Sequence, residues 1–152
     1  MRRGDILART EGKTFFEENE ALMTRLERVR LEVGRRAGLG DVRDSVISKI
    51  GILSGPRKGG AINSQYLTPH SLHPSHAVTG ALCIATASKA SGTVAADLAH
   101  VTSATSEKLL IEYQAGFLPI HIEVSSEGDD FTIVKAGMVR TARNIMEGHV
   151  YY

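Results

Sequence analysis

Residues 77–90 read AVTGALCIATASKA, a stretch of small and aliphatic side chains with no charge before Lys89. A helix made of these residues has no polar face for solvent, so we predict that it is buried on nearly all sides. Such a helix needs a sheet wrapped around it to cover its apolar surface. Cys83, one turn inside the helix, is then expected to be a small core residue.

Short β-like runs separated by turn residues lie on both sides of this helix. They are residues 45–54 (SVISKIGILS), 61–67 (AINSQYL), 108–113 (KLLIEY), 117–124 (FLPIHIEV) and 131–140 (FTIVKAGMVR). The turn GPRKGG joins the first two runs, and Leu118, Ile120 and Ile122 alternate along one face of the fourth. Short connections of this kind cannot cross over to a parallel neighbour, so we expect mostly antiparallel pairing and an α+β fold.

The first third of the chain is rich in Arg and Glu and predicts an amphipathic helix over about 19–36. Asn19 suits the N-cap position, and Gly38 ends the helix. The apolar residues that recur at helical spacing are Leu22, Leu26, Val29 and Val33. We interpret the charged residues between them as a solvated face. Residues 1–44 then form a helical lead-in to a domain over 45–152.

Composition excludes several classes of partner. The 152 residues fit one ordinary domain, and 18 Lys plus Arg nearly balance 17 Asp plus Glu, which gives a net charge of +1. This balance provides no electrostatic footprint for nucleic acid or an anionic membrane. No apolar run is long enough to span a membrane, MRRGDILART lacks the apolar core of a signal peptide, and the lone Cys83 cannot form an internal disulfide. We therefore expect a cytoplasmic protein.

The start of the predicted helix offers a site for an anion. The backbone N–H groups of Val78, Thr79 and Gly80 belong to its first turn and have no acceptor within the helix. The helix dipole adds about half a positive charge there, typically worth about 0.3 to 2 kcal/mol to a carboxylate. Gly80 would let a ligand approach the backbone closely, and the Thr79 hydroxyl could add a donor. We predict a carboxylate site at this helix start.

Three histidines in the preceding loop, TPHSLHPSH, raise the alternative of a metal site. His70, His73 and His76 are spaced three residues apart, which would place them on one face of a helix. Pro69 and Pro74 interrupt a helix at this point, and the loop contains no Asp, Glu or Cys ligand. We therefore expect histidines that form hydrogen bonds in a loop, and no metal.

Four stretches together resemble a known family. They are RLEVGRRAGLGDV (30–42), TPHSLHPSHAVTGALCIATA (68–87), GTVA (92–95) and VRTARNIMEGHVYY (139–152). From about Phe15 to Tyr152 the chain resembles the C-terminal half of PrpF-type proteins, the 2-methylaconitate cis-trans isomerase family, which includes 4-oxalomesaconate tautomerase and methylitaconate isomerase. The resemblance implies the fold of diaminopimelate epimerase, a curved, mostly antiparallel sheet wrapped around a buried central helix at about 77–90. It also implies a missing N-terminal half, because family members have two such domains with the active site between them.

The resemblance implies a cofactor-independent isomerase or tautomerase that shifts a proton between carbons of an unsaturated di- or tricarboxylic acid. The charge of the dienolate intermediate spreads onto a carboxylate, which donors at a helix start can stabilise. Carried onto this chain, the substrate-binding positions are Ser75, His76, Ala77, Val78, Thr79 and Gly80. His70 and His73 would contact these residues without touching the substrate. Arg140 and Arg143 are candidates for a carboxylate clamp, or equally for ion pairs that tie the last strand to its neighbour.

The catalytic base is not assigned by this resemblance. In the family, the lysine and cysteine discussed as acid and base belong to the N-terminal domain, and Ala77 stands where epimerase relatives carry a cysteine. His76 is the remaining candidate. Three hypotheses follow: an isomerase chain that needs an N-terminal half to supply the base, a homodimer whose two copies share a cleft, or a non-catalytic module that binds a carboxylate or a partner.

Overall fold

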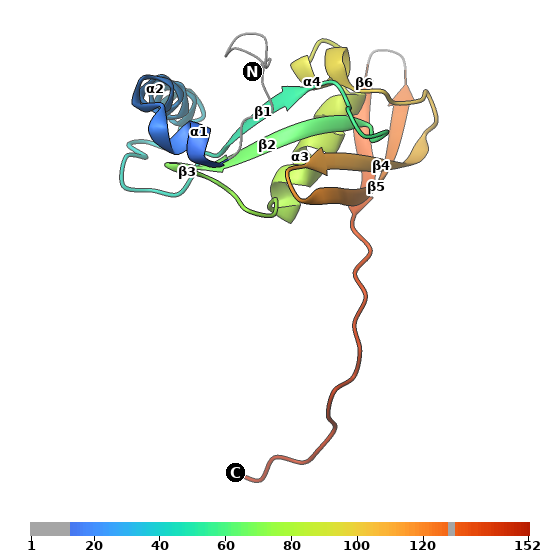
Figure 1. Cartoon of the computed structure of the whole chain (residues 1–152). Coiled ribbons are helices and arrows are strands. Elements are labelled where there is room, and N and C mark those ends of the chain that lie inside the picture. The colour runs from blue at the N-terminus through green and yellow to red at the C-terminus, as the bar shows by residue number, and fades with distance from the viewer. Residues whose placement is uncertain (1–12, 128–129) are drawn as a thin grey trace.

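A computed structural model describes residues 13–127 and 130–152, in which helices pack on a single curved sheet. The helices are α1 (Lys13–Glu18), α2 (Glu20–Arg36), α3 (Val78–Lys89) and α4 (Val94–Leu98). The strands are β1 (Ile50–Ser54), β2 (Ile62–Thr68), β3 (Ser71–Leu72), β4 (Ser106–Tyr113), β5 (Gly116–Glu127) and β6 (Asp130–Gly137). The sheet has the order β1-β2-β4-β5-β6, with β3 paired to β2. Figure 1 shows α3 lying along the sheet, and α1 and α2 lying beside the end of the sheet that contains β1 and β3.

Strand pairing is antiparallel everywhere in this sheet except between β2 and β4. Strands that follow one another closely in the sequence, β1 and β2, β4 and β5, and β5 and β6, pair antiparallel, which confirms the predicted pairing. β2 and β4 run parallel, with Ile62 opposite Ile111 and Asn63 opposite Glu112. The sequence did not predict this pair. It forms because α3 and α4 provide the long crossover that a parallel connection needs.

α3 is the predicted central helix, one residue shorter at each end than the predicted range 77–90. Ala81 and Ala85 are buried in the main core, where they pack with sheet residues such as Ile120. The opposite side of the helix is open, because Val78 is 41% exposed and Cys83 is exposed. The prediction of burial on nearly all sides, with Cys83 in the core, is therefore wrong. The sheet curls around one side of the helix, and the small residues reflect close packing there.

α2 matches the predicted helix over 19–36 at both ends. The Asn19 side chain accepts a hydrogen bond from the backbone N–H of Leu22 at 3.0 Å, as expected of an N-cap. Gly38 follows the helix with a φ of +72°, a conformation that favours glycine. A second apolar cluster joins this part of the chain to the sheet and contains Phe16, Leu26, Ile52, Leu67 and Leu72. Residues 1–12 of the predicted lead-in lie outside the described residues.

The buried face of α2 differs from the predicted one. Leu26, Arg30 and Gly34 are buried at a spacing of four residues, whereas Val29 and Val33 are 38% and 49% exposed. The prediction followed the apolar residues, and it was wrong because a buried arginine takes the place expected for a valine. This face of the helix therefore contacts polar backbone groups as well as apolar side chains.

Arg30 is 1% exposed and is held by hydrogen bonds. Its Nε and Nη2 each donate to the Glu27 carboxylate at 2.7 Å. Its Nη1 donates to the carbonyl oxygens of Ser45 and Ile47 at 3.1 and 2.5 Å. The strand predicted over 45–54 begins only with β1, and the residues before it form a loop whose carbonyls at Ser45 and Ile47 accept from the arginine.

Glu112 anchors the turn between β1 and β2. Its carboxylate accepts hydrogen bonds from the backbone N–H groups of Arg57, Lys58 and Gly60 at 2.8, 2.7 and 2.8 Å. The carboxyl lies at the junction of β2 and β4 and is fully buried. The predicted turn GPRKGG is therefore confirmed, and it is closed around a carboxylate from a strand far away in the sequence.

The segment after β6 leaves the sheet. Residues 138–152 have no regular secondary structure, and Figure 1 shows them leading away from the rest of the chain. The strand predicted over 131–140 thus ends early, at Gly137. The large apolar side chains exposed on this segment are Val139, Ile145, Met146, Val150, Tyr151 and Tyr152.

Candidate functional site

The start of α3 and the loop before it carry the predicted substrate-binding residues. Ser75, Val78 and Thr79 are exposed, Ala77 is half-buried, and His76 and Gly80 are buried. Ala77 is the N-cap in an extended conformation, without a hydrogen bond from its side chain. The first helical hydrogen bond runs from the Ala81 N–H to the Ala77 carbonyl at 3.0 Å. The N–H groups of Val78, Thr79 and Gly80 come before this bond and have no acceptor within the helix. The helix start is therefore uncapped and partly open.

Tyr66 of β2 occupies the space beside Gly80. A Cβ atom built at Gly80 would overlap the Tyr66 ring, so only glycine fits under this ring. Tyr66 is 8% exposed, and burial raises the pKa of its hydroxyl. The group that closely approaches the backbone at Gly80 is therefore the Tyr66 ring. The backbone N–H of Gly80 stays a predicted contact for the ligand.

Gly80→Ala is expected to lower the free energy of unfolding by about 1 to 3 kcal/mol, because the added methyl must displace the Tyr66 ring. An alanine inside a helix would otherwise stabilise the chain by about 1 kcal/mol. Urea unfolding measures the change. The same substitution in a Tyr66→Ala background should cost less, because the ring is gone. An equal cost in both backgrounds would show that the ring is not the obstacle.

His76 is engaged at both ring nitrogens. Nε2 lies 3.0 Å from the Ser64 hydroxyl, and Nδ1 lies 3.0 Å from the Ala77 carbonyl oxygen. Since a carbonyl only accepts, Nδ1 carries the hydrogen, and Nε2 accepts from Ser64. The ring stacks on Tyr66 with 4.6 Å between centroids. Burial lowers the pKa of His76, the bond to Ala77 opposes this, and His73 adds to the lowering. A pKa lowered from 6.5 favours the neutral ring at pH 7.

The other two loop histidines do not join His76 in one cluster. The backbone N–H of His73 donates to the Tyr66 carbonyl at 2.8 Å, and its Nδ1 accepts from the Ser75 N–H at 3.2 Å. His70 is exposed. On α2, hydrogen bonds from Arg30 lower the pKa of Glu27, burial opposes this, and the charge of Arg30 and then that of His70 lower it further. Across residues 13–127 and 130–152, no three potential metal ligands lie together, and no helix is long and apolar enough to cross a membrane.

Arg140 and Arg143 lie on the segment that leads away from the sheet, and both are exposed. Within the part of the chain that the structure describes, neither takes part in a salt bridge. The structure does not bring them to the start of α3. Their role as a carboxylate clamp stays a prediction.

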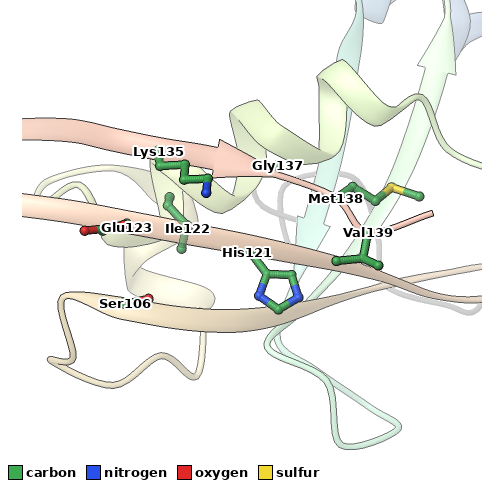
Figure 2. A pocket seen from close by; sticks show the side chains of 8 residues that line it. All are labelled: Ser106, His121, Ile122, Glu123, Lys135, Gly137, Met138 and Val139. Atoms are coloured by element: carbon green, nitrogen blue, oxygen red, sulfur yellow. The ribbon is translucent and has the colours of Figure 1, made fainter. Parts of the chain in front are cut away.

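A separate hollow of about 400 Å³ lies on the outer face of the sheet, away from α3 (Figure 2). Its lining residues are Ser106, His121, Ile122, Glu123, Lys135, Gly137, Met138 and Val139. His121 and Glu123 are exposed, whereas their neighbour Ile122 points into the core beside α3. The hollow is therefore on the opposite side of β5 from the candidate site.

Ser64 and Tyr66 were missed by the sequence analysis. They lie two residues apart on β2, so they share the face that looks toward α3. The alternation of AINSQYL contains this signal. A strand pattern tells which residues share a face, but the helix residue that each of them contacts depends on tertiary packing.

The sequence pattern of the family described as "PrpF protein" matches residues 7–152. The chain belongs to the PrpF family. This confirms the family expected from the four stretches. The PrpF match includes the whole region of the candidate site, from the loop histidines through α3, and it ends with the segment that carries the two arginines.

Individual relatives extend the comparison. The chain is 40% identical over 146 residues to "Putative isomerase YbhH" of Escherichia coli (strain K12), covering 92% of this chain and 41% of that protein. It is 38% identical over 135 residues to "4-oxalomesaconate tautomerase" of Pseudomonas putida, covering 89% and 36%. Its structure is similar to that of "Methylitaconate-delta-isomerase", with a TM-score of 0.81 at 22% identity over 99% of this chain and 43% of the other. The predicted fold is confirmed, and the chain spans about two fifths of the length of these proteins.

Proposed function

We propose that the chain is part of an isomerase or tautomerase of unsaturated di- or tricarboxylic acids, and that the start of α3 binds a substrate carboxylate. The uncapped N–H groups at this start, next to the exposed side chains of Val78 and Thr79, carry the proposal. The names of the relatives, isomerase and tautomerase, support the class of reaction. The proposed reaction uses no metal or organic cofactor.

The proposed chemistry is a 1,3-proton shift. A base removes a proton from carbon, the resulting dienolate places negative charge on a carboxylate, and a proton returns at the other end of the unsaturated system. The N–H groups of α3 are fixed by the helix and need no reorganisation as this charge grows. The helix dipole adds partial positive charge at the same place, and the Thr79 hydroxyl can donate a further hydrogen bond. These interactions lower the barrier to removing the proton.

The base in this proposal comes from outside the helix start. Ala77 has no ionisable group, and both ring nitrogens of His76 are engaged by the protein. We place the base in a second domain of a full-length protein, and the length of the relatives supports this, since the chain covers 41% of YbhH. A second copy of the chain that shares the cleft is the alternative source. Neither arrangement involves nucleic acid or a membrane.

An NMR titration of the ¹⁵N-labelled chain with trans-aconitate tests the carboxylate site. We expect the amide signals of Val78, Thr79 and Gly80 to shift, while most of the spectrum stays in place. The measurement needs no catalytic base, so it reports on binding even where turnover is absent. A well-dispersed spectrum in which these three amides do not move would rule out the site and favour a non-catalytic module.

Thr79→Pro is expected to weaken trans-aconitate binding about tenfold or more, because it removes a backbone N–H that would donate to a charged group. Proline is tolerated in the first turn of a helix, so the chain should stay folded. Thr79→Ala is the matched control, since it removes the hydroxyl and keeps the N–H, and it should weaken binding less. Unchanged affinity in Thr79→Pro would contradict the proposal. Gly80→Val is unsuitable as a probe because of the Tyr66 ring.

A further inference from the structure

The backbone at His76 is strained where the loop enters α3. Its φ is +153°, and among the described residues it is the one non-glycine residue with a positive φ. Such a conformation persists where the surrounding structure holds it in place. Here the ring of His76, which is 6% exposed, is held by two hydrogen bonds and by stacking on Tyr66. The loop is therefore fixed at the residue that precedes the N-cap.

The hydrogen bonds of His76 connect the sheet to the first carbonyl of α3. Ser64 on β2 is fully buried and donates to Nε2. Nδ1–H donates to the Ala77 carbonyl, which also accepts the first helical hydrogen bond from the Ala81 N–H. One carbonyl oxygen thus receives a donor from the side chain and a donor from the helix. The direction of the first peptide groups of α3 is set relative to β2.

We propose that His76 is a positioning residue, which, together with Ser64, holds the first turn of α3 so that its N–H groups face the substrate carboxylate. This inference rests on the proposed carboxylate site. Because the ring makes its contacts to the protein, His76 acts through the backbone and does not touch the reacting atoms.

The alternative role for His76 is that of the base, and the geometry disfavours it. A base needs a ring nitrogen that is free to take a proton from the ligand. Nε2 is occupied by a buried hydroxyl and Nδ1 already carries a hydrogen. Tyr66 and Tyr113 flank the ring and shield it further, with centroid distances of 4.6 and 6.4 Å. A buried polar group whose partners are all present is typical of a residue that specifies one conformation.

The state of the ring is measured first, in the chain without ligand. Long-range ¹H–¹⁵N NMR correlations of the histidine side chains distinguish the two neutral tautomers and the protonated form. At neutral pH we expect the neutral Nδ1–H form for His76. In Ser64→Ala we expect the His76 ring signals to move, because Nε2 loses its donor. A protonated ring, or the Nε2–H tautomer, would overturn the proposal.

The affinity for trans-aconitate is measured next, in three variants. Ser64→Ala and His76→Asn each keep a donor for the Ala77 carbonyl and lose the bond between Ser64 and residue 76, so we expect each to weaken binding about two- to tenfold. His76→Leu loses both bonds and should weaken binding by more than either. His121→Asn, an exposed histidine on the outer face of β5, is the matched control and should bind like the wild type.

The outcomes separate this inference from the proposed function. If the wild type binds trans-aconitate and all three variants bind equally well while folded, His76 does not position the site. If His76→Asn loses as much affinity as His76→Leu while Ser64→Ala loses none, the connection through Ser64 is wrong. If the wild type does not bind at all, the proposed function fails and the positioning role falls with it, whereas the tautomer measurement still reports whether the ring is held as described.

Discussion

Replacing Arg30 with methionine is expected to lower the free energy of unfolding by about 3 kcal/mol or more. Methionine fills a similar volume but donates no hydrogen bond. The carbonyl oxygens of Ser45, Ile47 and Val42, which now accept from the guanidinium, would lose their donor, and the Glu27 carboxylate would lose its partner. Urea unfolding followed by circular dichroism measures the loss. For a domain whose total stability is typically about 5 to 15 kcal/mol, this is a large fraction.

Arg35→Met is the matched control for this experiment. Arg35 lies on the same helix and forms a similar pair with Glu32 at 2.8 Å, but its side chain is 70% exposed. We expect the midpoint of unfolding to stay nearly unchanged, because exposed ion pairs contribute little. Arg30→Lys should fall between the two, since an ammonium cannot reach carboxylate and carbonyls together as a planar fork does. Equal effects at positions 30 and 35 would show that the buried hydrogen bonds are not what stabilises this corner.

Glu112→Gln is expected to cost about 2 to 4 kcal/mol of unfolding free energy. Glutamine has the same shape, but it keeps only one acceptor oxygen, and its NH2 group would face at least one backbone N–H group that the carboxylate now accepts from. Oε1 now accepts from Lys58 and Gly60, and Oε2 accepts from Arg57, so either placement of the amide would leave part of the turn between β1 and β2 without its acceptor. Glu123→Gln, on the exposed face of β5, is the control and should leave stability nearly unchanged. A neutral result at Glu112 would contradict the anchoring role.

Glu112→Gln should also change how the free energy of unfolding depends on pH. Burial raises the pKa of Glu112, but hydrogen bonds from Gly60, Arg57, Lys58 and Asn63 outweigh it and hold the pKa below its ordinary value of 4.5. A carboxyl with a lower pKa in the folded state contributes stability above its unfolded pKa and loses it as pH falls through the folded pKa. The wild type should therefore lose this contribution below about pH 4.5, and Glu112→Gln should lack that component. Parallel acid curves for both proteins would contradict this.

The spacing of apolar residues predicted the parts of the fold that are determined by residues close together in the sequence. The helix around Ala81, the alternation that buries Ile120 and Ile122, and the cap at Asn19 all follow from local spacing and are confirmed. The buried arginine of α2 could not be found in this way, because its partners are backbone carbonyls of a later loop. A charged residue on a helix is normally solvated, so only the folded loop reveals that Arg30 is not.

The candidate site shows the same limit. Small residues after a proline-containing loop predicted where the helix starts, and the structure has an uncapped start one residue from the predicted position. The neighbours Ser64, Tyr66 and Tyr113 come from two strands that meet only when the sheet closes. Spacing along the chain carries no information on such contacts, so the positioning role that we propose for His76 could be inferred only from the packed structure.

The parallel pair of β2 and β4 has a consequence for the order of folding. It divides the sheet into two parts, β1–β2 and β4–β5–β6, each of which is built from strands that follow one another in the sequence. Contacts between sequence neighbours form fast, whereas joining the two parts requires closing the chain over α3 and α4, and contacts of that kind are slow to form. We therefore expect the seam where Ile62 meets Ile111 to be the last part of the sheet to assemble and to limit the folding rate of the domain.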